Sequence, residues 1–234
     1  GASENAEVVK GLLEDIVARG VKPGRRRLFV IDGSKALRVA IDQVYGSDNP
    51  VQRCRNHKRR NVLSHLPKDQ HRQATATLSA AWKLDADEGC KKLEQYASRL
   101  EQECPSAAGS IREGMAEMFT VNRLEVPPKL TRCLVTTNVI DATYSGVRKR
   151  TDRVTNWQNG EMALRWAASA FVDTEHSCRK IMGYAQLWML KTHLDETRDQ
   201  ENVVDKRKKE IDADILDKQG KIHEGLQQIK AVKY

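Results

Sequence analysis

The sequence predicts an α/β fold that an all-helical segment interrupts, and three observations carry this prediction. Two short runs at 27–31 and 51–54, the first rich in Val and Ile, are typical of buried strands. Amphipathic helical patterns precede and separate these strands, and the long connections favour parallel pairing. Nearly seventy residues of helical pattern then follow, with little strand signal among them. Two strands make a poor sheet alone, so we expect further strands upstream of residue 1.

Composition narrows the class of protein. Of 234 residues, 39% are hydrophobic and 31% charged, and no run of eighteen apolar residues suggests a membrane span. The first residues lack a basic and then apolar leader, so we expect no secretory signal. Five scattered cysteines, never in a C-x-x-C pair, fit a reducing compartment better than a disulfide framework or a zinc ribbon.

Positive charge is concentrated in one part of the chain. Residues 21–72 hold thirteen Lys and Arg against four Asp and Glu, a net charge of +9, whereas the whole chain carries +8. A local excess of this size favours a polyanionic partner, most simply nucleic acid, although an ordinary solvated basic face has the same composition. Residues 198–234 carry nine basic and eight acidic side chains, which indicates a solvated helix or loose tail.

The first part of the chain alternates helix and strand. Apolar residues spaced three and four apart predict a helix over 4–19, which Gly20 closes. The first strand ends at Ile31, and a second helix is expected over 34–45 before the strand at 51–54.

The remainder reads as mostly helical. We expect a basic helix from about His57 to Leu66, helices over 69–100 and 111–121, and a short extended piece at 130–135. Two further helices are expected over 138–150 and 160–176. The predicted domains are a first core part at 1–66, a helical insertion at 67–130, a last core part at 131–192 and a charged helical tail at 193–234.

Asp32 stands directly after the first strand. A carboxylate cannot stay ionised inside an apolar core, so Asp32 should lie at the open end of that strand, where its oxygens could face a ligand or a metal ion. Capping of the following helix through Gly33 and Ser34 explains the same residue equally well.

Several motifs together resemble the catalytic domain of Mutator-type transposases of bacterial insertion sequences, which belong to the DDE class. The resemblance covers roughly residues 3–190. The matching stretches are Val30-Ile-Asp-Gly33, Gln52-Arg-Cys-x-x-His57-Lys-x-x-Asn61, 63–67, Thr136-Thr-Asn-x-Ile140 and Trp157-x-x-Gly-Glu-Met-Ala-Leu-Arg-Trp166.

This resemblance implies a ribonuclease-H-like core, incomplete at its N-terminus, and metal-dependent cleavage and transfer of DNA strands. In that family three carboxylates hold two divalent ions, Mg²⁺ or Mn²⁺. Asp32 matches the second carboxylate and Asp141 stands where the family has Glu, while the first Asp is expected upstream of residue 1. Hard cations prefer such oxygen ligands.

Two departures from the family pattern keep other functions open. The first carboxylate is not in this chain, so we expect the chain alone to be inactive. Asp141 is one methylene shorter than Glu, and a carboxylate there could equally stabilise the first turn of a helix. The alternatives are a catalytically inactive DNA-binding or interaction remnant of a transposase, and a ribonuclease-H-like nuclease without strand transfer.

Three further residues are expected to line the site: Cys54, His57 and Asn138. One Cys and one His three apart are weak evidence for zinc, which takes four ligands. A structural role for Cys54 and a satisfied, non-catalytic His57 remain open as well.

Basic residues near the carboxylates are expected to contact DNA phosphates, although a solvated helix face is the simpler reading. They are Arg53, Arg55, Lys58, Arg59, Arg60, Arg148, Lys149 and Arg150. Trp82 could stack on a base, but its apolar helical stripe favours the core, and we also assign Trp157 and Trp166 to packing. The resemblance implies terminal inverted repeats and target DNA as partners, a homo-oligomer, and a bacterial cytoplasmic, nucleoid-associated location.

Overall fold

A computed structural model describes residues 5–196 and residue 207. The chain divides into a first unit of residues 1–190 and a second unit of residues 191–234, of which residues 191–196 are helical. The predicted tail at 193–234 therefore lies mostly outside the described residues. None of the helices within the described ranges has the length and apolar character needed to span a membrane.

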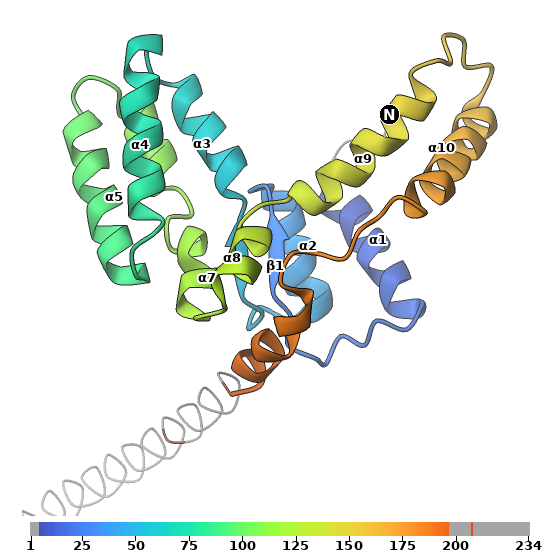
Figure 1. Cartoon of the computed structure of the whole chain (residues 1–234), viewed down its shortest axis with the longest axis horizontal. Helices are drawn as coiled ribbons and strands as arrows, with labels where there is room; N and C mark the ends of the chain where they lie inside the picture. Colours follow the sequence, from blue (N-terminus) through green and yellow to red (C-terminus); the bar gives the residue numbers. More distant parts are fainter. Residues whose placement is uncertain (1–4, 197–206, 208–234) are drawn as a thin grey trace, which may run out of the picture. The chain divides into compact units, whose positions relative to one another are not determined.

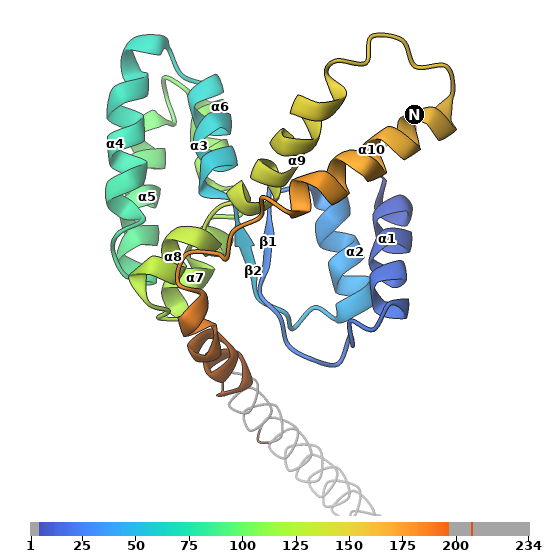
Figure 2. The same ribbon diagram turned by 45° about the vertical axis from the view of Figure 1, so that its right-hand side comes forward.

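The first unit begins with the expected α/β alternation. Its elements are α1 (Ala6–Ala18), β1 (Phe29–Ile31), α2 (Lys35–Tyr45) and β2 (Val51–Arg53). The two strands pair in parallel, with Phe29 opposite Val51 and Ile31 opposite Arg53. Helices α1 and α2 pack against each other on one side of the strands (Figures 1 and 2). This arrangement is compatible with an α/β fold, and it is the part of the prediction that the structure supports.

A helical bundle follows β2. It comprises α3 (Arg55–Ser64), η1 (Lys68–Gln70), α4 (His71–Ala81), α5 (Ala86–Leu100), α6 (Pro105–Arg112), η2 (Ala116–Phe119) and α7 (Thr120–Arg123). Figures 1 and 2 show this bundle on the side of the strands opposite α1 and α2. Helix α3, placed in the 1–66 segment by sequence, adds Val62 to the bundle core, and Leu66 just after it does the same.

Two expected helices of the insertion are broken into shorter pieces. The helix expected over 69–100 is interrupted between α4 and α5, because Asp85 caps α5 by accepting hydrogen bonds from the backbone N–H groups of Asp87 and Glu88. The helix expected over 111–121 is instead the end of α6, then η2 and α7, with Gly114 between α6 and η2 at a φ of 61°. The structure confirms helical structure in both ranges, but each expected single helix is divided into shorter helices.

The last part of the first unit holds α8 (Pro128–Leu134), α9 (Asn138–Thr151), α10 (Gly160–Glu175) and η3 (Tyr184–Gln186). The extended piece expected at 130–135 is wrong, since Pro128 occupies the first turn of a helix, where its missing N–H costs nothing. Helices α9 and α10, both predicted, form an antiparallel hairpin in which Tyr144 meets Phe171 edge to face (Figures 1 and 2).

Candidate functional site

The carboxyl ends of the two parallel strands lie at the same edge of the sheet. Asp32 follows β1 and Cys54 follows β2, and the backbone N–H of Cys54 donates to the carbonyl of Ile31 at 2.7 Å. Asp32 is therefore the chain neighbour of a residue that is hydrogen-bonded to Cys54. In open α/β sheets, ligands bind outside this end of the strands.

Asp32 is exposed, and it braces the turn into α2. Its Oδ1 accepts from the backbone N–H of Ser34 at 2.9 Å, while Ser34 itself caps α2 by accepting from the N–H of Leu37. Gly33 between them has a φ of 110°, a conformation that favours glycine. The capping role proposed for Asp32 thus belongs to Ser34, and Asp32 supports the turn with one carboxylate oxygen.

Thr137 links Cys54 to Asp141. The Sγ atom of Cys54, which is fully buried, lies 3.4 Å from both the backbone nitrogen and the Oγ1 atom of Thr137. The same Oγ1 atom lies 3.1 Å from Oδ2 of Asp141 and 3.4 Å from Nδ1 of His57. Three of the predicted site residues therefore meet at one hydroxyl group that sequence reasoning did not select.

The hydroxyl group of Thr137 has three hydrogen-bonding neighbours but only one proton to donate. The hydroxyl can donate once and accept twice, and an ionised Asp141 can only accept. If Thr137 donates to Asp141, any bonds to the thiol of Cys54 and to Nδ1 of His57 require those groups to donate in turn. If Thr137 donates to Cys54 instead, Asp141 loses that bond. The hydroxyl thus couples the hydrogen bonding of Cys54 to that of Asp141.

The environment of Cys54 also affects its acidity. Burial raises the pKa of the Cys54 thiol, but hydrogen bonds from Thr137 and His57 act in the opposite direction and together lower it below its ordinary value. The thiol is therefore more acidic than a buried cysteine in an apolar core.

Asp141 and Asn138 lie in the first turn of α9. Both side chains are exposed, and the amide nitrogen of Asn56 donates to Oδ1 of Asn138 at 3.0 Å. A carboxylate in this position interacts favourably with the helix N-terminus, so the local stabilising role considered for Asp141 is available to it. The bond to Thr137 is an additional contact that helix stabilisation does not require.

Arg53 sits in a slot between two glycines. A Cβ atom on Gly33 would lie 2.8 Å from Nη1 of Arg53, and one on Gly114 would lie 2.6 Å from its Nε. The guanidinium pairs with Glu113 and Glu117 at 2.9 Å each. Burial alone would lower the pKa of Arg53, but these carboxylates outweigh it and raise the pKa. Arg53 thus connects the turn after Asp32 with the loop after α6.

Arg55 and Lys58 are occupied inside the bundle. Arg55 is 8% exposed and donates to the carbonyls of Met118 and Trp82, and burial lowers its pKa to about 10. Lys58 is 2% exposed and donates to the carbonyl of Ser110 and to Glu113, with burial again lowering its pKa. Their donors are already used within the protein, so a role in DNA contact stays a prediction that this geometry does not favour.

The other basic residues are more accessible. Arg60, Arg148 and Lys149 are exposed, and half-buried Arg59 donates to the side chain of Asn56. Arg150 pairs with Asp173 of α10 and also donates to the carbonyl of Gly146. The exposed members are therefore the ones placed to meet a ligand from solvent.

The tryptophans divide between core and surface. Trp82 is 7% exposed within the bundle core, and the guanidinium of Arg55 lies over its ring, so its assignment to packing is confirmed. The same assignment is wrong for Trp157 and Trp166, which are 42% and 44% exposed. Trp157 lies in the connection between α9 and α10, and Trp166 lies within α10.

Carboxylate oxygens are suitable donors for Mg²⁺ or Mn²⁺, but their number is small here. Over residues 5–196 and 207, no group of three His, Cys, Asp or Glu side chains is arranged to hold a metal ion. Asp32 and Asp141 thus fit a divalent ion by donor type and fall short of a complete site by number.

Comparison with known proteins identifies relatives of this chain. The sequence model of a family described as "Transposase, Mutator family" matches residues 1–180. The chain is 31% identical over 146 residues to the transposase for insertion sequence element IST2 of Acidithiobacillus ferrooxidans, covering 62% of this chain and 48% of the relative. It is 29% identical over 152 residues to the transposase for insertion sequence element IS6120 of Mycolicibacterium smegmatis, covering 64% and 46%.

A third relative extends the match along the chain. The transposase for insertion sequence element ISRM5 of Rhizobium meliloti is 26% identical over 191 residues, which cover 81% of this chain and 47% of the relative. The chain thus spans about half the length of the curated relatives it matches.

Proposed function

Because the chain belongs to the Mutator family of transposases, we propose that it supplies two of the catalytic carboxylates, Asp32 and Asp141, for metal-dependent cleavage and transfer of DNA strands. The DNA acted on would be the terminal inverted repeats of an insertion sequence and a target site.

One observation carries this proposal: a continuous path of bonds joins the end of β1 to Asp141. The path runs from Ile31, which precedes Asp32, through the backbone and thiol of Cys54 to the hydroxyl of Thr137 and on to Asp141. The strand end that carries Asp32 and the helix turn that carries Asp141, 109 positions apart in the chain (141 minus 32), are thus joined through Cys54 and Thr137. A purely local role for each carboxylate would not require that link.

Two divalent ions, when bound, would activate the attacking oxygen and stabilise the leaving oxygen. Asp32 and Asp141 would contribute ligands, with the remaining carboxylate coming from outside the described residues. Thr137 would orient Asp141, and Cys54 would hold Thr137 through its backbone and side chain. The shorter side chain of Asp141 would place its oxygens about one carbon–carbon bond further back than those of Glu, at a cost in rate.

We further propose that the pair of parallel strands belongs to a ribonuclease-H-like core, which the strand order and the helical insertion after β2 support. Exposed Arg60, Arg148 and Lys149 would provide phosphate contacts beside the carboxylates. A homo-oligomer is proposed by resemblance alone, and sedimentation of the protein with paired DNA ends would test it.

The decisive experiment measures cleavage of end-labelled terminal-repeat DNA in Mn²⁺ by the full-length transposase that contains this sequence. We expect Asp32→Ala and Asp141→Asn to abolish cleavage and Asp141→Glu to raise it. Asp152→Asn, which removes an exposed carboxylate just after α9, is the matched control and should leave cleavage unchanged. Cleavage that survives both Asp32→Ala and Asp141→Asn would disprove the assignment.

A catalytically inactive DNA-binding remnant is the second candidate, and Asp141 in the place of the family's Glu favours it. It predicts that the full-length protein binds DNA with a steep salt dependence, and that neither the unmodified protein nor its Asp141→Glu variant cuts DNA. A nuclease without strand transfer would cut DNA but fail to join labelled ends to a target plasmid. Cleavage and joining assays on the same protein preparation therefore distinguish the transposase, the inactive remnant and the nuclease.

A further inference from the structure

Helix α5, together with its C-cap residue Glu101, carries two stripes of charge with the same spacing. Glu94 and Glu101 are seven positions apart, as are Lys92 and Arg99. Seven positions are nearly two full turns of an α-helix, so each pair lies on one side of the helix, about 10 Å apart along its axis. The two stripes differ in what they face.

The acidic stripe is paired with a single arginine of the bundle. Arg112 of α6 donates from Nε to Glu94 at 2.9 Å and from Nη1 to Glu101. Because the guanidinium binds both carboxylates, this stripe serves the contact between α5 and α6.

The basic stripe faces α4, which contains no Asp or Glu. Within the described part of the chain, no carboxylate lies within ion-pair distance of Lys92 or Arg99. Between the two helices is a hollow of about 440 Å³. Its lining residues include Gln73, Thr77, Lys92, Gln95, Arg99 and Glu103. Glu103, at one end, is the single acidic residue among them.

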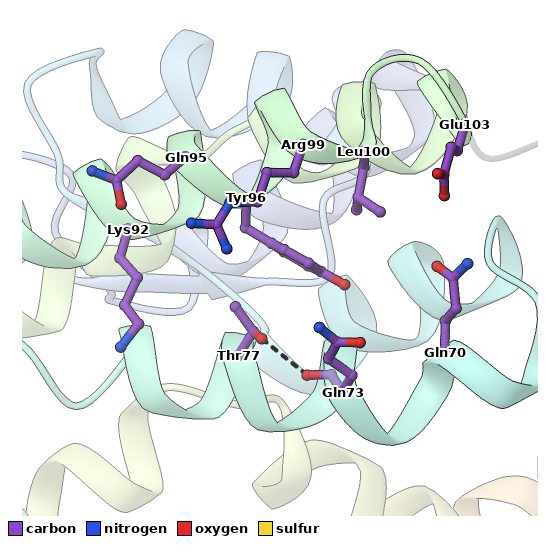
Figure 3. A pocket seen from close by; sticks show the side chains of 9 residues that line it. All are labelled: Gln70, Gln73, Thr77, Lys92, Gln95, Tyr96, Arg99, Leu100 and Glu103. Atoms are coloured by element: carbon purple, nitrogen blue, oxygen red, sulfur yellow. Dashed lines mark hydrogen bonds between the residues drawn. The ribbon is translucent and has the colours of Figure 1, made fainter.

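Figure 3 shows how these side chains are arranged: Lys92, Gln95 and Arg99 project from α5, and Gln73 and Thr77 project from α4. Tyr96 and Leu100 belong to the bundle core, so the base of the hollow is fixed by packing. The hydroxyl of Tyr96 is protonated near neutral pH, and burial raises its pKa further. The walls therefore offer hydrogen-bond donors beside two cations.

We propose that this hollow, the α4–α5 groove, binds the phosphate backbone of DNA and gives the bundle a DNA contact separate from the carboxylates. The proposal rests on the proposed function, since it extends the path of the same DNA. A small anion would need the two cations to converge on one point. Lys92 and Arg99 instead leave the helix about 10 Å apart along its axis, a length that spans about three nucleotides of one strand and so suits a repeated charge.

The test is the salt dependence of DNA binding by this chain, measured by fluorescence anisotropy with a labelled duplex. Lys92→Gln with Arg99→Gln removes both groove cations. Lys83→Gln with Lys91→Gln removes two exposed lysines of the bundle that do not line the groove, so the net charge changes equally. Thermal unfolding followed by circular dichroism would verify that both variants keep their fold.

Loss of two phosphate contacts should lower the slope of log affinity against log salt by about 1.8, and weaken binding about tenfold or more at low salt. The control pair should change the slope by much less. Equal effects of the two pairs would overturn the groove proposal while leaving the proposed function in place. If the unmodified chain and the full-length protein bind no DNA at all, the proposed function fails together with the groove.

Discussion

The helical bundle and the α/β part differ in how they are held together. Among the described residues, the bundle core contains sixteen buried side chains from α3 to η2, whereas the core between the strands and α2 contains three, Ile31, Ile41 and Val51. A two-stranded sheet with so small a core is marginal by itself. The region that carries the proposed chemistry is thus the less self-supporting of the two.

Polar contacts from β2 to the bundle compensate for this difference. Gln52 is fully buried, and its amide donates to the carbonyl of Met118 and accepts from the N–H of Val121. The hydroxyl of Thr120 donates to the carbonyl of Val51 at 2.6 Å. The Thr120 hydroxyl satisfies a backbone carbonyl of β2, and the Gln52 amide ties β2 to backbone groups of the bundle, so the bundle supports the sheet.

Replacing a leucine by alanine in each region should give the largest difference in the free energy of unfolding. Leu93→Ala in the bundle core removes a fully buried side chain and should lower the free energy of unfolding by about 3 kcal/mol. Leu37→Ala in α2, where the side chain is half-buried, should lower it by about 1 kcal/mol. Urea unfolding measures both, and an equal or larger loss at Leu37 would show that the α/β part is better packed than its small core implies.

A second contrast separates activity from stability at Thr137. Thr137→Val keeps the shape of the side chain and removes the hydroxyl that contacts Cys54, His57 and Asp141. We expect cleavage by the full-length protein to fall about tenfold, because Asp141 loses an orienting bond. Thr137→Ser keeps the hydroxyl and should retain most of the activity. Full activity of the Val variant would show that the hydroxyl of Thr137 has no role in cleavage.

The smallest expected effect is on stability at acid pH, and it arises at Glu113, which binds Arg53 of β2 and Lys58 of α3. Burial raises the pKa of Glu113, but hydrogen bonds from Lys58 and Arg53 outweigh this and hold it below the ordinary value of 4.5. Glu113 therefore contributes stability that is present above pH 4.5 and lost as the pH falls through its lower folded-state pKa.

Urea unfolding at several values from about pH 6 to about pH 3 would measure this contribution. Stability should fall more steeply in the unmodified protein than in Glu113→Gln, which is already without the charge. Glu103→Gln, on an exposed carboxylate of the bundle away from Lys58 and Arg53, is the matched control and should leave the steepness unchanged. Parallel curves for the unmodified protein and Glu113→Gln would contradict the assignment.

Local sequence patterns predicted most of the elements and the position of Asp32, because a strand end and a helix start are encoded by neighbouring residues. The resemblance selected Cys54, His57 and Asp141, three residues that Thr137 links in the structure. Thr137 itself was missed, although it stands at the N-cap of α9, because its contacts with His57 and Cys54 come from residues 80 and 83 positions away.

The burial of charged residues could not be read from local sequence. Arg55 and Lys58 stand in a basic run that resembles a solvated face. Their hydrogen-bond partners Met118 and Glu113, however, lie 63 and 55 positions further along the chain. Trp166 shows the reverse, since an apolar residue in a helical pattern proved to be exposed. In both cases the outcome depends on which elements pack together, which the pattern of one helix does not contain.

The contact of Arg53 with both Gly33 and Gly114 has a consequence during protein synthesis. Gly33 and Gly114 close on the same guanidinium but are separated by 81 positions in the chain (114 minus 33). During synthesis, the turn that carries Asp32 leaves the ribosome long before the loop that completes the slot. The turn that carries Asp32 therefore gains this contact only after the loop between α6 and η2 has been translated.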